Sequence, residues 1–428
     1  MKKISLTTQL MLALALGVTF GFFLQLFEPS YFRDDFLLNG VLHFVGTAFF
    51  NLVRMLITPL VLVSVITGVA SLSDAKTFGK IGGKIVFIYM LTTAIGVVIA
   101  LSLVSVFNPG HGLDMSGVVY LQPTINETQG ILAVLLNIIP TNPFMALNTG
   151  NMLQILFFAC LFGFSIVLMG DSAAPVKSFF ESVNAVILRM VTLSMKLAPY
   201  GIFALLAQTF ANLGLDAILA LFGYIALVWV ALFIHIIIVY GGIFAFIFRR
   251  NPNTGKRLSL AIFFKKMVAP MTFAFASSSS AATLPITMKA ADSLGLSRKI
   301  SSFAIPLGVT LNMDGTAIKQ GIAVVFLATI YGVSLSFGDF VIIILTATLA
   351  SIGTAGVPGA GIIMLSVVLT SVGLPVEAIA IVFGVDRILD MPRTTLNVTG
   401  DVLYTAVVAQ QEGLLDYDQY DAVDEVKE

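Results

Sequence analysis

The chain has few charged residues, one cysteine and three histidines. Only 11% of its 428 residues are charged, whereas soluble domains carry roughly 25%. So few charges cannot cover a water-facing surface, so lipid must be the main solvent. Cys160 is the single cysteine, which excludes a disulfide within the chain and indicates a small buried apolar side chain. His43, His111 and His235 lie far apart and follow no metal-ligand spacing, so we assign none of them to a metal.

The charges that are present are balanced, with 23 Lys and Arg against 23 Asp and Glu. This balance gives no basic surface for nucleic acid. The sequence also has no evident nucleophile–base pair, metal-ligand cluster or phosphate-binding loop, so an enzyme is the least expected function. The remaining class is an integral membrane protein, since 58% of the residues are hydrophobic.

Long apolar runs predict membrane-spanning helices in the first 250 residues. They lie at about 8–27, 41–71, 80–107, 129–170, 176–212 and 217–248. About 20 residues cross the hydrocarbon core, so the longer runs must tilt, bend or break. Pro140 and Pro143 predict a break in the fourth run. The first run is long for a signal peptide and lacks a clean cleavage site, so we interpret it as a transmembrane helix.

Basic residues fall mainly in alternate connections between these runs. They are Lys2, Lys3, Lys76, Lys80, Lys84, Lys177 and those of the segment FRRNPNTGKR at 248–257. By the positive-inside rule, the N-terminus and the loop near residue 253 are predicted to be cytoplasmic. The acidic segment 416–428 is predicted to be a flexible cytoplasmic tail.

After residue 257, polar and glycine-rich tracts interrupt the apolar runs. They are FASSSSAATLP (275–285), TLNMDGTA (310–317), ASIGTAGVPGAG (350–361) and DRILDMPRTTLNVTGD (386–401). Irregular backbone survives at membrane depth only where protein buries it or a wet cavity adjoins it. The first and third tracts therefore predict two re-entrant helical hairpins, at about 257–295 and 337–373. Hairpins entering from opposite sides indicate an inverted repeat, as in secondary transporters.

Several charged residues lie in this apolar context. An ionised side chain near the bilayer centre costs about 2.5 kcal/mol or more, so it is retained for a partner, a cavity or an ion. The spacing i, i+4, i+7, i+11, i+15 places one polar set on a single helix face, namely Asp386, Asp390, Arg393, Asn397 and Asp401. Oxygen ligands without nearby His or Cys favour an alkali or alkaline-earth cation.

A salt-bridge ladder that merely joins helices is the alternative interpretation of these charges. The NMDG tract around Asp314 and the serine-rich hairpin tip argue against it, because neither is needed to join helices. Lys319, just over one helical turn beyond the tract, is ambiguous.

The tracts together resemble the glutamate transporter family, the dicarboxylate/amino acid:cation symporters. The serine-rich tip, NMDGT, GTAGVPGAG and DMPRTTLNVTGD occur in the family's order and spacing, and YMLTTAIG and FNPG extend the match to about residues 8–410. The resemblance implies an all-α membrane protein with eight transmembrane helices and two re-entrant helical hairpins. It also implies a homotrimer in the cell inner membrane that works as an elevator, with both termini cytoplasmic.

The resemblance further implies a division of the chain into a fixed scaffold and a moving transport domain. The scaffold would comprise 1–75 (helices 1 and 2) and 129–215 (helices 4 and 5, which trimerise). The transport domain would comprise 76–128 (helix 3 and its loop) and 216–415 (helix 6, both hairpins, helices 7 and 8).

Residue roles follow from the same resemblance. Arg393 would bind the distal carboxylate of the substrate and Asp390 its ammonium group. Further substrate contacts would come from Ser278, Ser280, Thr316, Val357, Gly361, Thr394 and Asn397. Sodium ions would bind at three sites, formed by Asp401 with Gly308, Asn312 and Asn397; by carbonyls of Thr310, Ser351, Ile352 and Thr354; and by Asp314 with Asn312, Tyr89, Thr92 and Thr93.

The Asp390 and Arg393 pair favours an acidic amino acid, glutamate or aspartate, because C4-dicarboxylate members of the family lack the aspartate and neutral amino-acid members lack the arginine. Ser278 and Met391 stand where many members have a further arginine, for which Arg387 is the candidate substitute.

Pro392 stands where glycine or another residue is usual, and it would loosen the helix locally. Gln320 stands where proton-coupled animal relatives have glutamate, which predicts no proton carried there. A proton-coupled or C4-dicarboxylate symporter and an anion-conducting channel remain as alternatives.

Overall fold

The computed structural model describes residues 6–70, 79–110, 139–248, 251, 255, 258–352, 354, 356 and 359–422. Within these ranges the regular structure is helical, apart from one isolated bridge between Leu296 and Leu415. Seven helical segments of the described chain are long and apolar enough to cross a membrane: Thr8–Gln25, Tyr31–Ala70, Ile81–Phe107, Gln154–Met195, Leu219–Ile247, Leu260–Ser277 and Arg298–Ile330. The predicted all-α membrane fold is confirmed.

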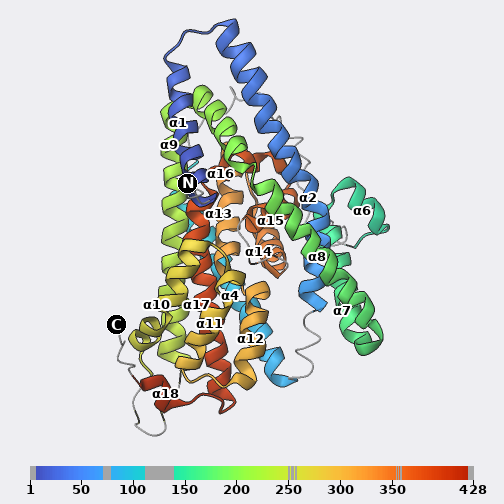
Figure 1. The fold of residues 1–428 in the computed structure, drawn as a ribbon, viewed down its shortest axis with the longest axis vertical. Coiled ribbons are helices and arrows are strands. Elements are labelled where there is room, and N and C mark those ends of the chain that lie inside the picture. Colours follow the sequence, from blue (N-terminus) through green and yellow to red (C-terminus); the bar gives the residue numbers. More distant parts are fainter. Residues whose placement is uncertain are drawn as a thin grey trace, which may run out of the picture.

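One group of helices extends to the top and right of Figure 1. It consists of α1 (Leu6–Gln25), η1 (Tyr31–Leu42), α2 (His43–Ala70), α6 (Pro143–Thr149), α7 (Met152–Met169), η2 (Gly170–Ala173) and α8 (Ala174–Met195), with the first half of α9 (Ala198–His235). Helix α1 lies along α9 at very short range. A Cβ atom at Gly21 would come within 2.7 Å of the Ala207 carbonyl oxygen, so only glycine permits this approach.

The predicted boundary between the fifth and sixth runs is wrong. Residues 213–216, expected to connect two helices, lie inside the continuous helix α9. The chain breaks earlier, between Met195 and Ala198, where Pro199 lies in the first turn of α9. Proline fits a first helical turn because its missing N–H is not needed there. A single glycine such as Gly214, by contrast, is tolerated inside a helix. Helix α9 continues into η3 (Ile236–Tyr240) and η4 (Ile243–Ile247).

The predicted break in the fourth run is present in its described part. Helix α6 ends at Gly150, whose φ of 69° is left-handed, and Asn151 caps the start of α7. Proline lies in the first turn of α6, as its fixed φ favours. Residues 129–138 of this run lie outside the described residues.

The second group surrounds α17 (Asp386–Gln411), which runs in red through the middle of Figure 1. Its other members are α4 (Lys80–Phe107), α10 (Leu260–Ser277), α11 (Ser280–Ser293), α12 (Arg298–Leu311), α13 (Asp314–Ile330), α14 (Phe337–Ile352), α15 (Ala360–Ser371), η5 (Val376–Ala378) and α16 (Ile379–Phe383). Helix α17 packs against α10, α11, α12, α13, α4 and α9. This packing buries α17, although one face of this helix is polar.

The two predicted hairpins are present as α10–α11 and α14–α15. The base of the first lies beside α18 at the lower end of Figure 1, and the second leads through η5 into α16 in the upper half. Their tips meet, because the Gly356 carbonyl accepts hydrogen bonds from Ser279 Oγ at 2.7 Å and the Ala281 N–H at 3.1 Å. Between the hairpins, the chain unwinds at Asn312 and Met313, within the predicted interruption.

The acidic C-terminal segment departs from the prediction of a flexible tail. Residues Tyr417–Asp421 form α18, and the buried Tyr420 hydroxyl donates to the Ser259 carbonyl at 2.9 Å. Lys266 Nζ donates to the carbonyls of Ser293 and Gln419, each at 2.7 Å. Tyr420 and Lys266 supply contacts that the acidic composition of the segment did not reveal. Residues 423–428 lie outside the described part.

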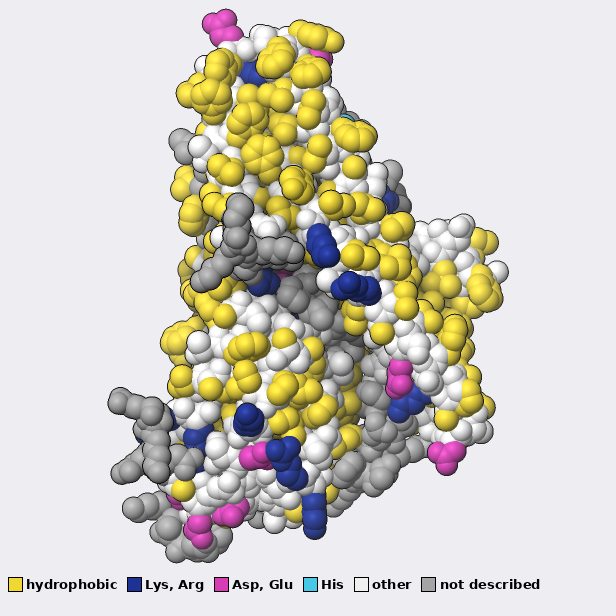
Figure 2. Space-filling view, viewed as in Figure 1, with side chains coloured by type: hydrophobic (Ala, Val, Ile, Leu, Met, Phe, Trp, Pro, Cys, Tyr) yellow, Lys and Arg dark blue, Asp and Glu magenta, His cyan; other side chains and the backbone are white. Residues whose placement is uncertain are grey.

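The outer surface is largely apolar. Figure 2 shows hydrophobic side chains over the upper and middle parts of this face, with most visible charged side chains toward the lower end. Large apolar residues are widely exposed, among them Phe246 at 90% and Phe44 at 73%. Such a surface fits hydrocarbon rather than water.

Candidate functional site

The polar face of α17 lies inside the protein. Asp386, Asp390, Arg393, Asn397 and Asp401 are all buried, with exposed fractions of 7% or less. They face the first turns of α13, the break after α12 and the tip of the second hairpin. One long helix thus carries these groups from the hairpin tips to the broken helix.

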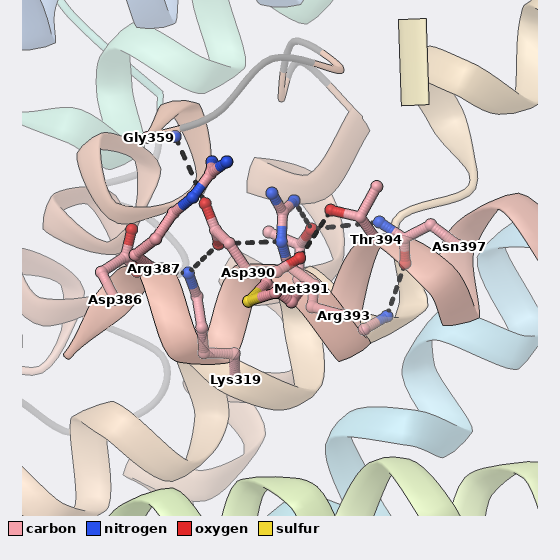
Figure 3. A network of polar contacts seen from close by, with 12 residues as sticks. Lys319, Gly359, Asp386, Arg387, Asp390, Met391, Arg393, Thr394 and Asn397 are labelled. Atoms are coloured by element: carbon pink, nitrogen blue, oxygen red, sulfur yellow. Dashed lines mark hydrogen bonds and ion pairs between the residues drawn. The ribbon is translucent and has the colours of Figure 1, made fainter. Parts of the chain in front are cut away.

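Asp390 is the centre of a network of ion pairs (Figure 3). Its Oδ1 lies 2.9 Å from Arg393 Nε, one helical turn further along α17. Its Oδ2 accepts a hydrogen bond from the Gly359 N–H at 3.3 Å, which ties the second hairpin to α17. Arg393 Nη1 donates to Thr316 Oγ1 at 2.8 Å. The structure therefore brings together Asp390, Arg393 and Thr316.

Lys319 is the member of this network that sequence reasoning left unassigned. Its Nζ lies 2.8 Å from Asp390 Oδ1 and 2.5 Å from Asp386 Oδ1, and its side chain is buried (Figure 3). A lysine within the apolar sequence of α13 was the available signal, because such a charge needs a partner.

The salt-bridge interpretation thus describes one end of the polar face. Asp386, Asp390 and Arg393 have ionic partners within the chain, while Asn397 and Asp401 further along are held by amide groups.

Asn397 and Asn312 organise the other half of the face. Asn397 Oδ1 accepts from the Gly315 N–H at 2.8 Å, and Asn312 Nδ2 donates to the Asn397 carbonyl at 3.0 Å and to Asp401 Oδ1 at 2.8 Å. A Cβ atom at Gly308 would lie 2.5 Å from Asp401 Oδ1, so this carboxylate lies directly against the α12 backbone. The predicted first sodium set is thereby brought together.

This set offers oxygen atoms of the kind that hold a hard cation. Asp401 Oδ2 and Asn312 Oδ1 are buried and have no hydrogen-bond donor among the described residues. Two buried acceptor oxygens without donors suit a hard cation. In the described part of the chain, no three His, Cys, Asp or Glu side chains gather as a metal cluster, so the available ligands are mixed oxygen atoms.

Asp314 is the centre of a second buried polar cluster. Its Oδ1 accepts from Thr93 Oγ1 at 2.5 Å and lies 3.4 Å from Thr92 Oγ1. Its Oδ2 accepts from the Tyr404 hydroxyl at 2.7 Å and lies 3.3 Å from His235 Nε2.

Sequence reasoning did not place Tyr404 or His235 in this cluster, because the family resemblance pointed to neither of them. Tyr89, which it did place there, donates its hydroxyl to the Ala304 carbonyl at 3.0 Å.

The remaining predicted sodium set lies at the C-terminal ends of α12 and α14, which are in contact. The hydroxyls of Thr310, Ser351 and Thr354 donate to carbonyls of their own helices, at 3.0, 2.7 and 2.9 Å. The Ser351 carbonyl already accepts a hydrogen bond from the Thr354 N–H at 3.2 Å. Among the described residues, no contact brings the carbonyls of Thr310, Ser351, Ile352 and Thr354 to one point.

The hairpin tips supply the other predicted substrate contacts. Ser278 takes a left-handed φ of 53°, and its buried hydroxyl has no hydrogen-bond partner among the described residues. Ser280 is also buried, and the Gly361 carbonyl accepts from Gln320 Nε2 at 3.1 Å. Arg387 Nη2 donates to the Ser277 carbonyl at 3.3 Å.

Thr394 is a predicted substrate ligand on α17. The Thr394 hydroxyl donates to the Asp390 carbonyl at 2.7 Å, within α17. Val357 lies outside the described residues.

Paired hairpins around a broken helix and an acidic helix face are features expected of a secondary transporter. The sequence profile of the sodium:dicarboxylate symporter family matches residues 6–411. The chain belongs to this family. It is therefore a multi-pass membrane symporter and not an enzyme, as predicted.

Relatives of this symporter differ in their named substrates and coupling ions. The proton/glutamate-aspartate symporter of Escherichia coli (strain K12) is 34% identical over 424 residues, covering 97% of this chain and 94% of the relative. The proton/sodium-glutamate symport protein of Bacillus subtilis is 33% identical, covering 96% and 94%. The C4-dicarboxylate transport protein 2 of Mesorhizobium japonicum is 31% identical, covering 96% and 91%. The choice among these chemistries rests on the site.

Proposed function

We propose that this symporter imports an acidic amino acid, glutamate or aspartate, together with sodium ions. The observation that carries the proposal is the buried pair of Asp390 and Arg393, whose Oδ1 and Nε atoms lie 2.9 Å apart. An α-amino dicarboxylate needs a negative partner for its ammonium group and a positive partner for its distal carboxylate. The two relatives named as glutamate symporters support the same substrate class.

Arg393 binds the distal carboxylate in this proposal, because a guanidinium group can donate two parallel hydrogen bonds to a carboxylate. Asp390 binds the ammonium group. Thr316, Thr394 and Asn397 lie next to this pair and contribute hydroxyl and amide groups. Ser278, Ser280, Val357 and Gly361 close the site from the two hairpins.

Sodium ions neutralise the acidic half of the site in this proposal. One binds Asp401 with oxygen atoms of Gly308, Asn312 and Asn397, and the donor-free Oδ2 of Asp401 supports this assignment. Others bind at Asp314 with Asn312, Tyr89, Thr92 and Thr93, and at the carbonyls of Thr310, Ser351, Ile352 and Thr354. Because uncompensated carboxylates are costly within a membrane, bound cations favour the closed, loaded site. This links solute uptake to the sodium gradient.

The movement proposed is an elevator, with residues 1–75 and 129–215 as scaffold and 76–128 and 216–415 as transport domain. Helix α9 runs through the boundary at residue 215, so this movement requires α9 to bend there. The two helix groups meet through the edge-on rings of Phe49 and Phe383, 5.3 Å apart, and through the ion pair of Arg54 with Glu377. The second hairpin serves as the extracellular gate.

The protein forms a homotrimer in the cell inner membrane, with both termini cytoplasmic, in this proposal. Light scattering of the purified protein tests the trimer, and labelling of single cysteines introduced into a Cys160→Ser chain tests the orientation.

Uptake into proteoliposomes tests the transport function. Labelled aspartate or glutamate should accumulate only with an inward sodium gradient. Equal accumulation with a proton gradient alone would reject sodium coupling. Current that persists without solute and at channel-like rates would favour an anion channel instead.

A C4-dicarboxylate symporter is the second candidate, and one contact favours it. Lys319 Nζ already lies 2.8 Å from Asp390, at the carboxylate proposed to bind the ammonium group. Competition by succinate against labelled aspartate separates the two substrate classes.

A further inference from the structure

Lys319 is the only basic residue of α13, and its side chain is almost completely buried. A buried ammonium group is costly unless it is paired, so its partners determine its role. Those partners are two carboxylates of α17, Asp386 and Asp390. No part of the proposed amino-acid chemistry requires a lysine here.

The position of this ammonium group coincides with that proposed for the substrate's own. Lys319 Nζ and Arg393 Nε approach the same oxygen of Asp390, at 2.8 and 2.9 Å (Figure 3). An amino acid that binds through Asp390 must therefore compete with Lys319. A dicarboxylate without an amino group leaves the Lys319 contact in place.

Asp386 gives Lys319 a second partner. It lies one helical turn before Asp390, and its Oδ1 is 2.5 Å from Nζ. When a substrate ammonium group occupies Asp390, Lys319 retains the pair with Asp386. The lysine therefore has a partner in both cases, and its displacement leaves no buried charge alone.

We propose that Lys319 is a specificity-determining residue, a tethered ammonium group on Asp390 that admits C4-dicarboxylates to the site and weakens amino-acid binding. This inference rests on the proposed function, because it assumes that Asp390 and Arg393 bind the solute. It assigns the second carboxylate, Asp386, to holding Lys319 when an amino acid binds.

The experiment measures inhibition constants of succinate and L-aspartate on the full-length protein in proteoliposomes with a sodium gradient. The wild-type protein should bind both ligands. Lys319→Met should bind aspartate about tenfold more tightly and succinate about tenfold more weakly, because Asp390 is then free to pair with an ammonium group and repels a second carboxylate. The ratio of the two constants should therefore shift about a hundredfold.

Two further variants keep the experiment decisive. Lys319→Met combined with Asp386→Asn removes one charge of each sign and should show the same ratio shift, even if the single variant folds poorly. Lys289→Met removes an exposed lysine of α11 and should leave the ratio unchanged.

The outcomes separate the inference from the function on which it rests. If wild-type protein binds aspartate but not succinate, or if both constants move together in the Lys319 variants, the role of Lys319 is rejected and the amino-acid proposal stands. If wild-type protein binds neither ligand, the proposed function itself fails.

Discussion

Asn312 donates its side-chain N–H to Oδ1 of Asp401 at 2.8 Å, which orients a carboxylate whose other oxygen has no donor among the described residues. The two residues are 89 positions apart in the sequence. The amide thus fixes one oxygen of Asp401 and leaves the second for a cation. This arrangement is the structural basis for the first prediction.

Asp401→Asn should lower the apparent sodium affinity at least tenfold. The variant keeps the shape of the side chain but removes the negative charge that offsets the cost of dehydrating the cation. The measurement is the sodium dependence of aspartate binding by calorimetry. Asp171→Asn, which changes an exposed carboxylate beyond α7, is the matched control. An unaltered sodium dependence would remove Asp401 from the cation site.

Arg393→Ala should abolish uptake of acidic substrates, since it removes the guanidinium group proposed to bind the distal carboxylate. Truncation of a buried charged partner costs about 2–5 kcal/mol, which is a loss of affinity of roughly thirtyfold or more. Labelled uptake and calorimetry both report this loss. Arg189→Ala removes an exposed arginine of α8 as the control, and unchanged affinity in Arg393→Ala would exclude Arg393 from the site.

Tyr404→Phe should destabilise the protein and weaken the cluster around Asp314. The change removes a buried hydroxyl that donates to Asp314 Oδ2 at 2.7 Å, and leaving a buried acceptor without its donor costs about 1–3 kcal/mol. Thermal unfolding of the purified protein measures the effect. Tyr200→Phe, at a residue 68% exposed, should leave the unfolding temperature unaltered. Equal stability of the two variants would contradict the importance of this hydrogen bond.

Lys266→Met should loosen α18 from the base of the first hairpin. Lys266 Nζ donates to the carbonyls of Ser293, Gln419 and Tyr420, so its loss removes two of the hydrogen bonds that hold α18 and leaves that of Tyr420 with Ser259. Limited proteolysis should then cleave within residues 417–422, where wild-type protein resists. Lys265→Met, one residue earlier and exposed, supplies the comparison. Equal cleavage of both variants would count against the anchoring role.

Much of the fold followed from local sequence because lipid imposes strict rules on the backbone. The serine-rich and glycine-rich tracts predicted the two hairpins, and the NMDG tract predicted the break at Asn312 and Met313. The boundary predicted at residues 213–216 was wrong, because two adjoining apolar runs do not show whether the helix continues between them. Helix α9 packs against α1 on one half and against α4 and α13 on the other. Only this packing distinguishes one continuous helix from two helices joined by a connection.

The sequence by itself determined the solvent, the helical class and the shared face of Asp386, Asp390, Arg393, Asn397 and Asp401, because these depend on composition and on helical spacing. The tertiary structure decided which distant groups meet that face. Lys319 reaches Asp386 across 67 positions, and Tyr404 reaches Asp314 across 90. Helical periodicity carries no information on such pairs, since the angles and offsets of packed helices set them.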